Sequence, residues 1–228
     1  MIGDAAEEIE SASTNYERVR DAIRDGITGG FYKQGSRLKV AELCRQHGAS
    51  SNPVREALQH LQGEGLVVVS PNQGATVRVI NTDLIRYIYE IGEGVDGIVA
   101  RRCATIAQPF QIEKLRELAA GVQQADLDND EQERTAYNTA FHEEIALISG
   151  NIEAMDIRRR HKNLIRVIRR QCGYSPTRFE KIHFEHLSIV EAIAAADPEA
   201  AEYAARVHRR RSCEDMLLRY HGFPDNTK

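Results

Sequence analysis

Residues 50–79 constrain the fold more than any other part of the chain. They read SSNPVREALQHLQGEG and then LVVVSPNQGATVRV. In the first part, apolar residues follow the helical spacing i, i+3, i+4 and i+7: Val54, Ala57, Leu58 and Leu61. Asn52 is expected to cap this helix, Pro53 to occupy its first helical position, and Gly65 to end it in the left-handed conformation.

The opposite face of this helix is polar. It carries Arg55, Gln59 and Gln62, side chains of a kind that reach phosphates and base edges of DNA. The valine-rich segment 67–69 and the segment 76–79 predict two strands of a tight β-hairpin. A short helix followed by such a hairpin is typical of a DNA-reading head with a wing.

Two further helices are expected upstream, at residues 16–27 and 40–47, the second closed by Gly48. With the hairpin they predict a winged helix-turn-helix domain over residues 15–80. Residues 1–14, which are acidic, are expected to form a disordered tail.

An ordered series of motifs runs through this domain: residues 19–30, Gly35-Ser36-Arg37-Leu38, Ala41-Glu42-Leu43, Pro53-Val54-Arg55-Glu56-Ala57-Leu58, Leu61, Glu64-Gly65-Leu66 and Pro71-Asn72-Gln73-Gly74. In these motifs the chain resembles the GntR family of bacterial transcription regulators. In that family the recognition helix enters the major groove and the wing glycine approaches the minor groove. The resemblance therefore implies that six residues contact DNA: Arg37, Ser51, Asn52, Arg55, Gln73 and Gly74.

Ser51 departs from the family pattern. The family commonly has an arginine at this position, and arginine can read guanine through two hydrogen bonds. We therefore do not carry the family's usual operator preference over to this chain.

The formal net charge of −4 is unusual for a DNA-binding protein until it is divided by segment. Residues 1–15 carry a net charge of −4, whereas residues 16–80 carry nine Lys or Arg against six Asp or Glu. Only the second of these segments is basic, and its excess is small. One copy should bind DNA weakly, so a homodimer on a two-fold symmetric operator is expected.

Other features of the sequence restrict the class of protein. No run of about twenty apolar residues could span a bilayer, and no signal peptide is recognisable, so the chain is expected to be cytoplasmic without membrane contact. The four cysteines form no CxxC pair and are interpreted as reduced: Cys44, Cys103, Cys172 and Cys213.

The strand pattern stops at residues 80–83, and the remainder predicts an all-α antiparallel helical bundle over residues 81–228. Its expected helices are residues 84–106, 111–126, 132–149, 152–172, 175–196 and 198–220. The predicted fold class is thus mainly α, a winged helix-turn-helix followed by this bundle. The arginine runs 158–160 and 209–211 are interpreted as surface and ion-pair residues, because a helix spreads three adjacent side chains over about 200 degrees.

Several histidines of the bundle could form a metal site. Asn138 and His142 lie one turn apart on one helix, while His186 and His208 lie on two later helices. Side chains from facing helices can converge in a bundle core. The alternative is that these histidines are separate, His142 being packed beside Phe141 and the other two half-exposed.

A second resemblance bears on that choice. The segments Asn138-Thr139-Ala140-Phe141-His142, Ser149-Gly150-Asn151, Glu185-His186-Leu187 and Ala192-Ile193, with Asp197 and His208, are similar to the FCD domain of FadR-type GntR regulators. In that family an Asp-x-x-x-His pattern and two later histidines hold a divalent metal at the floor of an effector cavity. The resemblance implies the ligands Asn138, His142, His186 and His208. Asn138 replaces the Asp and is a weaker, uncharged ligand. Zinc is the default, with nickel or cobalt also suited to three imidazoles.

The effector implied by this resemblance is a small carboxylate. The arginine that many such domains use on the first bundle helix aligns with Gly92 in this chain. Gly92, Gly94 and Gly97 could permit close packing, leave room for a ligand, or only weaken the helix. Arg101 and Arg102 are the nearby cationic alternatives, although such arginines are more often solvated.

We interpret the chain as a dimeric transcriptional regulator, a repressor by expectation, whose operator binding responds to a small organic acid held at or near a metal. One alternative is a DNA-binding dimer with no effector or metal, in which the bundle is only a dimerisation platform. Another is a metal-dependent hydrolase, since three histidines can activate water at zinc. No Glu or Asp stands in a recognisable general-base motif, so no enzyme activity is expected.

Overall fold

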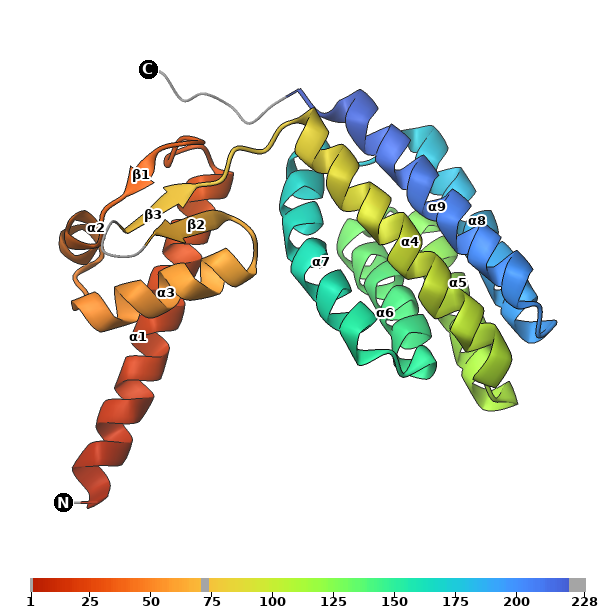
Figure 1. The fold of residues 1–228 in the computed structure, drawn as a ribbon, viewed down its shortest axis with the longest axis horizontal. Coiled ribbons are helices and arrows are strands. Elements are labelled where there is room, and N and C mark those ends of the chain that lie inside the picture. The colour runs from red at the N-terminus through yellow and green to blue at the C-terminus, as the bar shows by residue number, and fades with distance from the viewer. Residues whose placement is uncertain (1, 71–73, 222–228) are drawn as a thin grey trace. The chain divides into compact units, whose positions relative to one another are not determined.

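The computed structural model describes residues 2–70 and 74–221; its fold is drawn in Figure 1. The chain forms two compact units. Among the described residues, the first consists of residues 2–70, 74–81, 160–171 and 221, and the second of residues 82–159 and 172–220.

The first unit is built on three helices and a small antiparallel sheet with the strand order β1-β3-β2. Its elements are α1 (Ile2–Thr28), β1 (Arg37–Leu38), α2 (Val40–His47), α3 (Ser51–Gly63), β2 (Val67–Ser70) and β3 (Gly74–Val77). The register pairs Val68 with Thr76 between β2 and β3, and Arg37 with Thr76 between β1 and β3. The expected winged helix-turn-helix is therefore present.

The start of α3 differs from the expectation. The helix begins at Ser51 with Ser50 at its N-cap, so Asn52 is the second helical residue and caps nothing. Pro53 is the third helical residue and not the first, as was expected, but it lies in the first turn, where its missing N–H costs no hydrogen bond. At the other end Gly65 adopts a left-handed φ of +76°, and the Leu66 N–H donates to the Leu61 carbonyl at 2.9 Å, as in a Schellman cap.

Helix α1 begins at Ile2, whereas the sequence predicts a disordered tail over residues 1–14. The segment contains Ala and Glu, which favour helix, and no proline interrupts it. Strand β1 was also not predicted, because two residues are too short to show an alternating pattern.

Gly74 has a structural reason to be glycine. Its φ is +85°, and a Cβ at this position would lie 2.4 Å from the carbonyl oxygen of Leu38. Any side chain would therefore push β3 away from the end of β1. The close approach of these two strands explains this glycine without reference to DNA.

The second unit is an all-α bundle whose helices alternate in direction along the chain (Figure 1). Its elements are α4 (Thr82–Ile106), α5 (Pro109–Leu127), α6 (Glu131–Ser149), α8 (Pro176–Ala194) and α9 (Pro198–Arg219), together with the first part of α7 (Ile152–Cys172), whose residues 160–171 belong to the first unit. Asp197 caps α9 by accepting from the Ala200 N–H at 3.0 Å, with Pro198 next in line. Among the described residues no helix is long and apolar enough to cross a membrane.

The core of the bundle lies between α4, α5, α6, α8 and α9, with α4 and α9 side by side along their length (Figure 1). Phe141 and Leu115 are completely buried in it, as are Val190 and Ala201. This packing holds the inner faces of α6, α8 and α9 against one another, and the expected metal ligands lie on these three helices.

Candidate DNA-reading surface and candidate metal centre

Helix α3 separates an apolar face from a polar one. Val54, Ala57, Leu58 and Leu61 are buried, as their spacing predicts. Arg55 and Gln59 are exposed on the other side. Gln62 is exposed too, but its Oε1 accepts from the Val69 N–H at 2.6 Å and so connects α3 to β2. This hydrogen bond uses only the amide oxygen, and the DNA contact expected of Gln62 stays a prediction.

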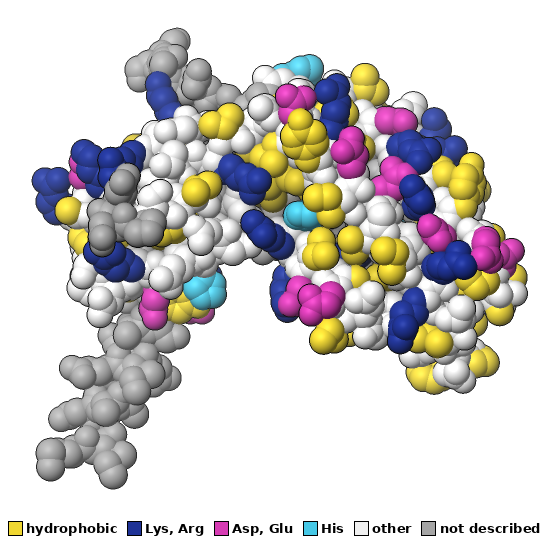
Figure 2. Space-filling view, in the orientation of Figure 1, with side chains coloured by type: hydrophobic (Ala, Val, Ile, Leu, Met, Phe, Trp, Pro, Cys, Tyr) yellow, Lys and Arg dark blue, Asp and Glu magenta, His cyan; other side chains and the backbone are white. Residues whose placement is uncertain are grey.

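The structure places four of the other predicted DNA contacts on the outside of the first unit. Ser51 and Asn52 are exposed at the start of α3, together with Arg55 one turn later, and Arg37 is exposed on β1. Gly74 begins β3, while Gln73 lies outside the described residues. Figure 2 shows lysine and arginine side chains gathered over the face of this unit that carries β1 and α2.

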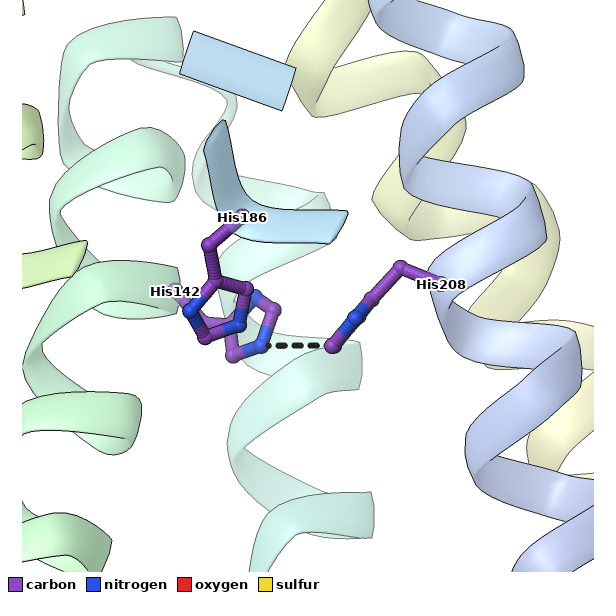
Figure 3. A group of neighbouring side chains, drawn as sticks. All are labelled: His142, His186 and His208. Carbon is purple, nitrogen blue, oxygen red and sulfur yellow. Dashed lines mark hydrogen bonds between the residues drawn. The ribbon is translucent and has the colours of Figure 1, made fainter. Parts of the chain in front are cut away.

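Three histidines converge in the core of the second unit. His142 comes from α6, His186 from α8 and His208 from α9 (Figure 3). One ligand nitrogen from each can be chosen so that all three lie within 4.8 Å of one another. The Nε2 atoms of His142 and His208 are 3.2 Å apart, and the His186 ring stacks on Phe141 with 4.1 Å between ring centroids. The alternative of three separate histidines is therefore wrong.

The buried Glu185 carboxylate contacts the ring nitrogen of His208 that faces away from the other two histidines. Glu185 Oε2 lies 2.8 Å from His208 Nδ1 and accepts from Arg178 Nη1 at 2.7 Å. The other oxygen accepts from Arg211 at 3.1 Å. A carboxylate between two guanidiniums can only accept, so His208 Nδ1 carries the proton and Nε2 presents its lone pair towards His142.

The environment keeps all three imidazoles neutral. Burial, followed by repulsion from Arg209 and Arg178, lowers the pKa of His142 to about 3. Burial is also the largest cause that lowers the pKa values of His186 and His208 well below the usual range, and neighbouring histidines and Arg178 add to it. Neutral imidazole is the form that binds a metal, so no proton has to leave before binding.

His186 provides the test of whether a metal fits. It is fully buried, and neither ring nitrogen has a hydrogen-bond partner among the described residues. A buried polar atom without a partner costs about 1–3 kcal/mol, so such a pair of nitrogens needs an explanation. A divalent metal among the three imidazoles would satisfy one of them.

Asn138 lies one turn before His142 on α6 and is half-buried. This placement gives it the same helix face as His142. Its role as a fourth ligand stays a prediction.

Neither expected effector arginine lies at this centre. Arg101 is exposed on α4 and pairs with Glu199 at 2.8 Å and Glu202 at 3.2 Å. Arg102 donates from Nε to the Ser149 carbonyl at 2.5 Å. Both are therefore engaged in holding α4 to neighbouring segments.

A small cavity borders His142 and His208, and the sequence did not predict its charged lining. Asp96 of α4 and Arg158 of α7 contribute to this lining and form an ion pair. Arg209 of α9 approaches the same carboxylate, with 3.6 Å between Nη1 and Oδ2. Arg158 and Arg209 belong to the two arginine runs interpreted as surface and ion-pair residues. Both form ion pairs, as expected, but they are partly buried and their partner is a buried carboxylate. A carboxylate among the apolar positions of α4, in the stretch GVDGIV, was the signal available in the sequence.

The fold and these two sites define a class, a DNA-binding transcription regulator with a helical ligand-binding domain. Comparison with models of protein families gives the same class. The model described as "Bacterial regulatory proteins, gntR family" matches residues 15–77, and the FCD domain model matches residues 87–211, more than half of the chain. The chain belongs to the gntR family of bacterial regulatory proteins and carries an FCD domain.

Curated relatives are named as regulators of transcription, not as enzymes. An HTH-type transcriptional regulator in the TAR-I ttuE-ttuC' intergenic region of Agrobacterium vitis is 31% identical over 146 residues, covering 63% of this chain and 83% of the relative. The probable D-xylose utilization operon transcriptional repressor of Paenarthrobacter nicotinovorans is 26% identical and covers 90% of each chain. The transcriptional repressor RspR of Escherichia coli is 24% identical and covers 88% of each. The hydrolase alternative therefore has no support.

Solved structures show the same fold. Lar, which controls expression of the agr system of Listeria monocytogenes, has a TM-score of 0.68 at 16% identity, covering 89% of this chain and 96% of its own. A GntR regulator from Rhodococcus sp. RHA1 has a TM-score of 0.62 at 22% identity, covering 91% and 100%. At such identities the likeness concerns the fold alone.

Proposed function

We propose that this regulator is a dimeric repressor whose operator binding responds to a small organic acid held beside a divalent metal. The observation that carries the proposal is the convergence of His142, His186 and His208, with both nitrogens of the buried His186 lacking a hydrogen-bond partner among the described residues. Two relatives bear the name repressor, which supports repression as the sign of regulation.

In this proposal the three histidines hold the metal, zinc by default, and Asn138 approaches from the same face of α6 as His142. Bound there, the metal supplies a positive charge that attracts a carboxylate. Glu185 fixes the tautomer of His208, and Phe141 packs against the ring of His186. Because the Glu185 carboxylate restricts His208 and the Phe141 ring restricts His186, little ordering would remain for metal binding to impose.

The DNA-reading role is assigned to α3 and the wing. Arg55 would contact a phosphate, and Ser51 and Asn52 would face base edges at the start of the recognition helix. Arg37 and the wing residues Gln73 and Gly74 complete the set of proposed contacts.

The homodimer is supported by one face of α4. Tyr87, Ile91 and Ile98 have exposed fractions of 59%, 51% and 52% and are spaced so that they share one side of the helix. Gly94 lies between them, and a Cβ there would have no neighbour within 4 Å, so a second helix could approach closely. Figure 2 shows apolar side chains among charged ones over this part of the bundle. We propose that a second copy covers this stripe and thereby joins two reading heads.

Regulation requires the acid to bind one arrangement of the dimer more tightly than another. An operator can be selected from randomised duplexes with the full-length, zinc-loaded protein. Titration of acetate, succinate and L-malate should then change its affinity for that operator, as measured by fluorescence anisotropy. An operator affinity that no acid changes, with or without zinc, would remove the effector from the proposal and leave a DNA-binding dimer.

A further inference from the structure

We propose that Asp96 is an internal counterion that an acidic effector must displace. In the ligand-free protein Asp96 neutralises Arg158. When an acid enters the cavity, Asp96 shifts towards Arg209 and releases Arg158 to the ligand's carboxylate. This inference rests on the proposed effector site and describes how that site sets its affinity.

The position of Asp96 is the first observation. It is buried on α4, at the wall of the cavity that His142 and His208 also line. Its carboxylate pairs with Arg158 from α7, while Arg209 from α9 stands 3.6 Å away on its second oxygen. A buried carboxylate is stable only with such partners. Asp96 therefore has two cationic partners on two different helices, and its carboxylate can form an ion pair with either of them.

The second observation explains why Arg209 is within reach. A Cβ at Gly92 would lie 2.5 Å from Arg209 Nη2 and 2.6 Å from Nε, so the guanidinium occupies the space of the missing side chain. The Arg209 guanidinium also lies over the Tyr89 ring, 4.7 Å from its centroid. Gly92 is the position at which the family resemblance would place an arginine. In this chain the cation next to α4 comes from α9.

The third observation concerns the charges around Asp96. The Asp96 carboxylate faces the guanidiniums of Arg158 and Arg209, and both side chains are largely buried. Burial, followed by repulsion from Arg209, lowers the pKa of Arg158 to about 10, so Arg158 stays charged at neutral pH. A carboxylate ligand would pair with this guanidinium, and Asp96 competes with the ligand for it.

Two variants with opposite expected effects test the inference. Asp96→Asn keeps the shape but removes the competing charge, so L-malate should bind the zinc-loaded full-length protein about tenfold more tightly in isothermal titration calorimetry. Gly92→Ala places a methyl group where the Arg209 guanidinium lies and so removes the alternative partner of Asp96. Malate should then bind several-fold more weakly, although alanine favours the helix more than glycine. Arg101→Gln is the matched control. Arg101 is an exposed arginine of α4 that pairs with glutamates of α9, and its substitution should leave the affinity for malate unchanged.

General damage to the fold would weaken malate binding in both variants, so a gain in Asp96→Asn cannot arise from it. If the wild type binds malate and folded Asp96→Asn binds no more tightly, Asp96 is not a competitor, while the effector site itself stands. Should Asp96→Asn fail to fold, unchanged binding by Gly92→Ala would overturn the inference. Absence of binding of malate, succinate and acetate to the wild type and to Asp96→Asn would contradict both this inference and the proposed effector.

Discussion

His208 and Glu185 form a buried hydrogen bond between α9 and α8, with 2.8 Å between Nδ1 and Oε2. Because the carboxylate can only accept, this bond fixes which nitrogen of His208 faces the cluster of histidines. It thus joins the candidate metal centre to the Arg178 and Arg211 guanidiniums behind it. Glu185, which precedes His186 on α8, therefore determines the tautomer of His208 on α9.

Substituting Glu185→Gln should weaken metal binding. The amide cannot supply the negative charge that fixes the His208 tautomer, and it leaves Arg178 without its buried counterion. Loss of a carboxylate that hydrogen-bonds a metal-ligating histidine lowers metal affinity by roughly 10–100-fold. Competition with a chromophoric zinc chelator measures the affinity, and the absorption spectrum of the cobalt-loaded protein reports the ligand arrangement.

Glu191→Gln is the control for this experiment. Glu191 lies on the same helix but is exposed and pairs with Arg116 at 3.2 Å. Its loss should leave zinc affinity and the cobalt spectrum as in the wild type. Equal affinities for the wild type and Glu185→Gln would show that the carboxylate does not act on the metal centre.

The stability of the metal-free protein should fall as the pH drops below about 6.5. In the folded protein the pKa of His142 is lowered to about 3, and the pKa values of His186 and His208 are also lowered. At a pH between the folded and the unfolded pKa of a histidine, the unfolded chain therefore binds more protons than the folded protein. The free energy of unfolding is therefore highest above the pKa that histidine has in the unfolded chain. It decreases as the pH falls below that value, by up to about 1.4 kcal/mol per pH unit for each histidine. Urea unfolding at pH 7 and pH 5 measures this loss. The variant His142→Gln should have a shallower dependence, and an identical slope would contradict the assigned environment.

Arg55→Ala should weaken binding to all DNA sequences alike. Arg55 is exposed on α3 and is proposed to contact a phosphate, so the slope of log affinity against log salt concentration should decrease by about one. Ser51→Arg should instead change which operator is preferred, because it adds a side chain that can read guanine. Anisotropy titrations on the selected operator and on random DNA separate the two effects.

Arg159→Ala serves as the charge-matched control, since Arg159 is exposed on α7 and pairs with its neighbour Asp156. It should leave both affinities unchanged. An equal loss of affinity on specific and random DNA for both Arg55→Ala and Ser51→Arg would contradict the separate roles given to these positions.

Ile91→Glu should convert the dimer to monomers. The change places a charge in the middle of the exposed α4 stripe, where a second copy would have to bury it. Sedimentation velocity measures the mass, and Leu218→Glu, at an exposed leucine near the end of α9, is the control. A monomeric wild type, or a dimeric Ile91→Glu variant, would place the dimer contact elsewhere or remove it.

The sequence predicted the elements well because their signals are local. The spacing of Val54, Ala57 and Leu58 indicated the buried face of α3, and Asp197 with Pro198 indicated the start of α9. Errors arose where the signal was weak. The two residues of β1 are too few for a pattern, and nothing local distinguishes Asn52 from Ser50 as the cap of α3.

The candidate site was predictable only in part. Helical spacing and family resemblance pointed to the histidines, but sequence spacing cannot show which buried charges meet across helices. Asp96, Arg158 and Arg209 lie on three helices and are brought together by tertiary packing alone. The reason for Gly92 was equally inaccessible, because it depends on the path of a side chain from α9.

The metal content of the purified full-length protein tests the central claim most directly. His186→Gln removes the buried ring from the centre, whereas His183→Gln changes a half-buried histidine one turn earlier on the same helix. Elemental analysis after dialysis against trace zinc should find about one metal per chain in the wild type and in His183→Gln, and almost none in His186→Gln. Equal metal content in His186→Gln and the wild type, or no metal in any of the three, would contradict a metal centre formed by these histidines.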